Sequence, residues 1–143
     1  MTTDGRTVEH AGFTERRRYG EGGTLVLRVL RRDGDPAVAL VVARGQLTPD
    51  SSPFLEDCLL DLREGRDGAV QRIVFDGIAL TKVTSNAVEP FVNARQAMGE
   101  NAFVFLGNSP PLVQVFGEVG LGGFFRIVES VDGGTAVYVR DGH

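Results

Sequence analysis

The stretch KVTSNAV at residues 82–88 contains the side chain most suited to regulatory chemistry, the hydroxyl of Ser85. It lies between an apolar run that ends in an acid, IVFDG, and a segment with helical spacing. A hydroxyl at such a junction could accept a phosphate, which adds about −1.5 to −2 charges and three strong acceptor oxygens. It could also cap the following helix by accepting a backbone N–H. The residue type and its position leave both interpretations open.

The other reactive side chains form no catalytic arrangement. Cys58 falls among leucines at helical spacing, and the two histidines, His10 and His143, lie near the chain ends. No imidazole is therefore placed to activate the thiol. Adjacent acids such as Glu56 and Asp57 fall on the polar side of one predicted helix, where solvation explains them. Because the sequence also lacks HExxH, CxxC, GxxxxGKS/T and GxGxxG motifs, we predict no enzyme activity, no cofactor and no metal site.

The composition is that of a globular protein. The 143 residues are 42% hydrophobic and 24% charged, and the formal net charge is −4. Such a chain lacks the basic surface that nucleic-acid binding requires, so we expect no nucleic-acid partner. It contains no signal-like segment and no run of about 18 apolar residues, so we expect a cytoplasmic protein without direct membrane insertion. The oligomeric state stays open.

Apolar and β-branched residues predict five strands, at residues 24–30, 37–43, 70–75, 102–106 and 124–128. The first two are joined by a turn that contains Asp33-Gly34, which predicts a hairpin. The run at 37–43 is almost continuously apolar, as in a strand that is covered on both faces.

Helical spacing predicts three helices. The first covers residues 53–64, with Ser52 as its candidate cap. The second follows Ser85 and ends at Gly99, but it contains Pro90, which has no backbone N–H. Either its first turn is irregular, or the regular helix starts near this proline. The third follows Ser109 and ends near residue 120.

The predicted fold class is α/β, with the element order β-β-α-β-α-β-α-β. This order indicates a mixed β-sheet of four to six strands packed by three or four helices. The polar, glycine-rich residues 1–23 predict a flexible N-terminal tail, or at most a short added strand, and residues 24–143 predict a single domain. Residues 129–140 are ambiguous, because a Gly-Gly pair disfavours a helix while residues 136–139 could form an edge strand.

Three stretches resemble the STAS family, which is named after sulphate transporters and anti-sigma-factor antagonists. VVARGQLTPDSS resembles the family's strand followed by Gly-Glu-Leu-Asp. IVFDGIALTKVTSNAV resembles its strand, loop and Asp-Ser-Ser-Gly, and FLGNSPPLVQVFGEVGLGGFF resembles its strand and Ser-Pro helix. The stretches span roughly residues 25–128 in the family's order.

The resemblance implies that Ser85 is the phosphate acceptor. In the family, the first serine of Asp-Ser-Ser-Gly is phosphorylated by a kinase that is also an anti-sigma factor, and the unphosphorylated form binds this partner so that sigma is released. Ser85 falls on that serine. Its neighbours depart from the motif, with Thr84 in place of the aspartate, Asn86 in place of the second serine and Ala87 in place of the glycine.

The resemblance also implies that two loops form the partner-binding site. In the first loop, Gln46 replaces the family's glutamate and Thr48 its aspartate. The second loop surrounds Ser85 and extends into the next helix. The predicted contact residues are Gln46, Leu47, Thr48, Asp50, Ser51, Thr84, Asn86, Val88 and Glu89.

The function implied is that of a regulatory protein-binding module similar to an anti-sigma-factor antagonist. Its partner would be an anti-sigma factor or a histidine-kinase-like ATPase, with control through phosphorylation of Ser85. The alternative is a STAS subunit attached to a membrane transporter, including the lipid-transport type, or a component of a signalling scaffold.

Overall fold

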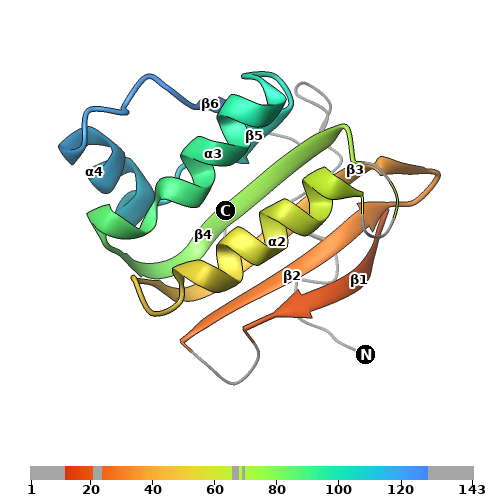
Figure 1. The fold of residues 1–143 in the computed structure, drawn as a ribbon, viewed down its shortest axis with the longest axis horizontal. Coiled ribbons are helices and arrows are strands. Elements are labelled where there is room, and N and C mark those ends of the chain that lie inside the picture. Colours follow the sequence, from red (N-terminus) through yellow and green to blue (C-terminus); the bar gives the residue numbers. More distant parts are fainter. Residues whose placement is uncertain (1–11, 21–23, 66–67, 69, 129–143) are drawn as a thin grey trace.

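The computed structural model describes residues 12–20, 24–65, 68 and 70–128 of the chain. They contain a six-stranded sheet in which the strands lie side by side in chain order (Figure 1). The pairs β1–β2 and β2–β3 are antiparallel, and the pairs β3–β4, β4–β5 and β5–β6 are parallel. The strands are β1 (Phe13–Tyr19), β2 (Leu25–Arg32), β3 (Asp35–Leu47), β4 (Arg72–Val83), β5 (Phe103–Leu106) and β6 (Arg126–Val128).

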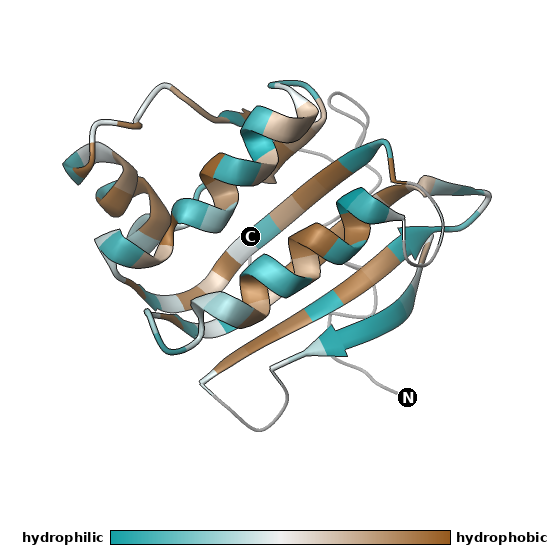
Figure 2. Cartoon of the chain, in the orientation of Figure 1, coloured by the Kyte–Doolittle hydropathy of each residue, from teal (hydrophilic) through white to brown (hydrophobic). Residues whose placement is uncertain are grey.

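Three α-helices connect the parallel strands and lie on the same face of the sheet (Figure 1). They are α2 (Ser52–Glu64), α3 (Glu89–Met98) and α4 (Pro110–Glu118), and a short 3-10 helix, η1 (Ser85–Ala87), precedes α3. The helices carry both hydrophilic and hydrophobic residues, whereas β2 and β4 are mostly hydrophobic and β1 is mostly hydrophilic (Figure 2). The predicted mixed α/β sheet with helical packing is confirmed.

A cluster of phenylalanine rings fills the space between the sheet and the helices. Phe91 of α3 packs edge-on against Phe75 of β4 and Phe105 of β5, with ring centroids 4.8 Å and 5.2 Å apart. Phe116 of α4 packs against the same Phe105 at 5.6 Å. Aromatic pairs of this geometry stabilise a core beyond the area that they bury. These rings hold α3 and α4 onto β4 and β5.

The opposite face of the sheet is apolar as well. Leu40 and Val41 are neighbours on β3 and point to opposite faces, yet both are 0% exposed. Other side chains buried on the face away from the helices include Leu30, Val74, Val104 and Leu106. Burial on both faces explains the continuous apolar run at residues 37–43, as predicted.

The N-terminal residues contain the short added strand that was expected as the alternative to a flexible tail, because Phe13–Tyr19 form β1. The many charges of this segment suit an edge strand, where they pair with neighbouring side chains. Arg28 on β2 donates to Glu15 at 2.6 Å, and Tyr19 donates from its hydroxyl to Asp61 on α2 at 2.5 Å. Burial alone would raise the pKa of the Glu15 carboxyl, but hydrogen bonds from Arg28 and Arg18 outweigh it and leave that pKa below its ordinary value. Residues 1–11 and 21–23 of the predicted tail lie outside the described residues.

The strand predicted at residues 70–75 is also different, because β4 continues to Val83. The predicted strand ends too early because Asp76 and Gly77 resemble the end of a strand. Asp76 instead lies within β4 opposite Val42, is 1% exposed, and accepts the backbone N–H of Ile78 at 3.1 Å. The extra length of β4 determines where the loop around Ser85 begins.

The observed ends of the helices agree to within one or two residues with those predicted from serine, proline and glycine positions. Ser51, and not Ser52, occupies the N-cap position of α2, and it makes no side-chain cap bond. Gly65 ends α2 in the left-handed conformation, with φ 78°. The strand predicted at residues 136–139 lies outside the described residues. No helix among the described residues is long and apolar enough to cross a bilayer.

Candidate functional site

The two predicted loops lie side by side at the carboxyl ends of β3 and β4 (Figure 1). The two strands are parallel and stay paired to their last residues, with Gln46 opposite Lys82 and Leu47 opposite Val83. Chain segments that leave adjacent parallel strands emerge at one edge of the sheet. Residues 48–51 and 84–87 are therefore neighbours in space.

Hydrogen bonds join the two loops to each other. The backbone N–H of Thr84 donates to the carbonyl of Leu47 at 3.0 Å, one residue beyond the end of β4. The hydroxyl of Ser52, at the start of α2, donates to the carbonyl of Ala87 in η1 at 3.3 Å. The second loop is thus tied both to the end of β3 and to the start of α2.

Ser51 organises the first loop from inside. Its hydroxyl donates to the carbonyl of Gln46 at 2.8 Å and accepts the backbone N–H of Thr48 at 3.0 Å. The residue is only 2% exposed. Because each of these backbone groups is satisfied by the same side chain, Ser51 fixes the path of residues 46–51.

Exposure divides the predicted contact residues into two groups. Leu47, Ser51 and Val88 are 1%, 2% and 4% exposed, so in this structure their side chains offer little surface to a partner. They hold the loops in place. Thr84 is half-buried, and its hydroxyl oxygen is buried with no hydrogen-bond partner among the described residues. The remaining residues, which we call the contact surface, are Gln46, Thr48, Asp50, Ser85, Asn86 and Glu89; Thr48 is half-buried and the others are exposed.

Ser85 is exposed, and within the described part of the chain its hydroxyl makes no hydrogen bond. The interpretation of Ser85 as a helix cap is therefore wrong. Thr84 precedes η1 and Val88 precedes α3 as the N-cap residues, and neither makes a side-chain cap bond. The hydroxyl of Ser85 remains accessible for modification.

Pro90 decides how the chain enters α3. The residues before it form η1, and α3 begins at Glu89 with Pro90 in its first turn, so both features foreseen for the proline are present. A proline there loses no helical hydrogen bond, because the first amides of a helix have no partner within it. As a result, Ser85 lies four residues before the start of α3. A phosphate on Ser85 would therefore not occupy the N-cap of α3, which is Val88.

One exposed residue beside the contact surface was not predicted, because the predicted strand ended before it. Lys82 is exposed near the end of β4 and lies opposite Gln46. The apolar residues Ile78, Leu80 and Val83, which continue beyond Gly77, were the available sequence signal for the longer strand.

The described residues show no arrangement for catalysis by Cys58 or for metal binding. Cys58 is fully buried in α2, where burial raises the pKa of its thiol. This confirms the predicted core position. Within the described ranges, no group of three or more His, Cys, Asp or Glu side chains could hold a metal ion.

No protein-family model and no curated protein sequence matches this chain. Solved structures do match. An anti-sigma factor antagonist from Mycobacterium paratuberculosis superposes with a TM-score of 0.59 at 16% sequence identity, over 76% of this chain and 88% of that one. The chain has the fold of that antagonist. The anti-sigma factor antagonist SpoIIAA in its unphosphorylated form gives a TM-score of 0.51 at 16% identity, over 84% of this chain and 90% of that one.

The opposite environments of Ser51 and Ser85 predict opposite effects of the same substitution. Ser51→Ala removes a buried hydroxyl that satisfies two backbone groups, so we expect the free energy of unfolding to fall by about 1–3 kcal/mol. Ser85→Ala removes an exposed hydroxyl without a partner, so we expect a change of less than about 0.5 kcal/mol. Urea denaturation of both variants measures these changes. A loss of about 1 kcal/mol or more in Ser85→Ala would restore the helix-cap interpretation.

Proposed function

We propose that this chain is a regulatory protein-binding module that binds an anti-sigma factor of the histidine-kinase-like ATPase type through the contact surface. The observation that carries the proposal is the exposed, unbonded hydroxyl of Ser85 on a turn that is fixed to the end of β3. The likeness in fold to two anti-sigma factor antagonists supports the class of partner.

The construction of the loops supports protein binding at this position. Their inward residues Leu47, Ala87 and Val88 are buried, while the outward residues are polar and exposed. A surface held by its own core loses little conformational entropy on binding, which favours affinity. The contact surface includes two carboxylates, of Asp50 and Glu89, and the exposed Lys82 lies at its edge opposite Gln46. The carboxylates outnumber this one cation, so a partner that presents neutral or basic groups fits the charge.

A phosphate on Ser85 would switch this binding off by local electrostatics. It would add about −1.5 to −2 charges to a surface that already contains Asp50 and Glu89. Because Ser85 precedes the N-cap of α3, the amides at the start of that helix do not neutralise the added charge. When a partner binds, the phosphate and the two carboxylates would all lose their hydration. The negative charges of the three groups would also repel one another. Binding would be lost without any refolding of the domain.

Binding is tested with a purified histidine-kinase-like anti-sigma factor from the same genome, by calorimetric titration. We expect Asn86→Arg to weaken binding about tenfold or more, because it places a large cation at the centre of the contact surface. Gln96→Arg is the matched control, since it makes the same substitution on an exposed residue of α3 about two turns beyond Glu89. Equal affinity of the two variants would contradict the proposed surface, and absence of binding by the unmodified protein to every such factor would contradict the proposed partner.

Phosphorylation is tested by incubating the chain with that partner and ATP and measuring the intact mass. We expect a gain of one phosphate group that disappears in Ser85→Ala, and the phosphorylated chain should no longer bind. A gain that persists in Ser85→Ala would place the acceptor elsewhere. If a kinase active on another substrate leaves Thr48, Thr84 and Ser85 unmodified, the phosphate switch fails while the binding proposal is judged by its own titration.

A further inference from the structure

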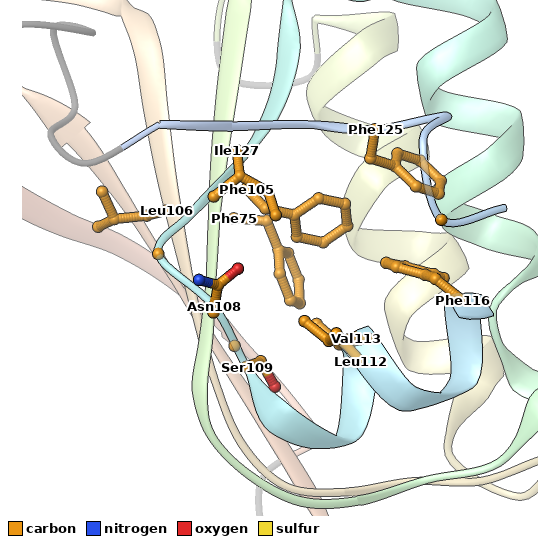
Figure 3. A pocket seen from close by; sticks show the side chains of 13 residues that line it. Phe75, Phe105, Leu106, Asn108, Ser109, Leu112, Val113, Phe116, Phe125 and Ile127 are labelled. Atoms are coloured by element: carbon orange, nitrogen blue, oxygen red, sulfur yellow. The ribbon is translucent and has the colours of Figure 1, made fainter.

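An apolar cavity lies between α4, the Phe75–Gly77 part of β4 and the carboxyl end of β5 (Figure 3). Its volume is about 130 Å³. Figure 3 shows the rings of Phe75 and Phe105 between Asn108 and Ser109 on one side and Phe116 and Phe125 on the other. Phe116 and Phe125 are stacked with centroids 4.7 Å apart, and Phe75 and Phe105 meet edge-on at 5.7 Å. The cavity is thus walled by aromatic rings that already pack in favourable geometries.

The buried hydroxyl of Ser109 lines this cavity and makes no hydrogen bond to any described residue. The residue as a whole is 5% exposed. A serine at the N-cap of a helix usually accepts a backbone N–H, but Ser109 makes no such bond. Pro110 and Pro111 follow it and have no N–H to donate. A buried hydroxyl that is left unpaired favours any ligand that can complete its hydrogen bond.

The lining also determines the charge of a suitable ligand. None of the residues that line the cavity is Asp, Glu, Lys, Arg or His. The two prolines remove amide donors from the start of α4, which weakens the attraction that a helix N-terminus has for anions. A charged group would lose its hydration without gaining a counter-ion, so the ligand is neutral.

The size of the cavity limits the ligand to a single ring. An engineered apolar cavity of about 150 Å³ in another protein binds benzene, and the cavity beneath α4 is only slightly smaller. We propose that this cavity binds a small neutral molecule with one six-membered ring and one hydroxyl group. The ring lies among the phenylalanines, and the hydroxyl pairs with the Oγ atom of Ser109.

Phenol and benzene are the probes that test this site, because they differ by the hydroxyl alone. The full chain is titrated with each ligand, and the methyl signals of Leu112, Val113 and Ile127, which line the cavity, are followed by NMR. We expect saturable shifts of these signals with both ligands and tighter binding of phenol. Ser109→Ala should weaken phenol binding about fivefold, the effect of one hydrogen bond, and leave benzene binding within about twofold.

A second variant tests whether binding depends on the cavity itself. A Cβ atom at Gly77 would lie 2.9 Å from Cδ1 of Leu112, so Gly77→Ala narrows the cavity and should weaken both ligands. Unequal effects of Ser109→Ala on phenol and benzene, with a loss of both in Gly77→Ala, would support the site. The proposal is overturned if phenol gives no saturable shift at these methyl groups, or if Ser109→Ala affects phenol and benzene equally.

Discussion

The parallel pairing of β3 and β4 to their last residues is the constraint on which the candidate site depends. The hydrogen bond from the Thr84 N–H to the Leu47 carbonyl continues this pairing into the loop that contains Ser85. The pairing is irregular, with register shifts between Val42 and Arg44 and between Gly45 and Gln46. Gly45 makes the second shift compatible with the sheet. Its φ is +104°, and a Cβ atom there would overlap the carbonyl oxygen of Thr24, which already accepts the N–H of Gln46.

The aromatic core holds the loop that contains Ser85 against the sheet. Phe91, one residue after Pro90, packs between Phe75 and Phe105, so the start of α3 is held against the two central parallel strands. Ala87 and Val88 are buried just before it, which leaves η1 with little freedom to move. The exposed polar residues of the contact surface are therefore held in place by the buried residues Leu47, Ala87 and Val88, which lie between them along the chain. The same aromatic cluster walls the cavity beneath α4, and α4 also packs against η1.

Sequence periodicity predicted most of the helices and strands, because their apolar patterns match the faces that they bury. It gave β1 only as an alternative to a flexible tail, since this edge strand is stabilised by cross-strand pairs such as Glu15 with Arg28, which join residues distant in sequence. It also shortened β4, because an acid followed by glycine, Asp76-Gly77, resembles the end of a strand. The positions of the two loops followed from the resemblance, but the inward direction of Leu47, Ser51 and Val88 did not. Side-chain direction depends on register, and a motif does not specify register. The cavity could not be predicted because its walls come from segments that meet only in the folded chain.

The central claim is that the two loops form one fixed surface before any partner binds. Hydrogen exchange of individual backbone amides in the free protein tests it most directly, with attention to the Thr84 amide, which donates to Leu47, and the Thr48 amide, which donates to Ser51. The account predicts that both amides exchange slowly, at rates close to those of the paired residues at the ends of β3 and β4. Exchange of either amide at the rate of an unprotected loop would show that the loops open independently, and would contradict the account.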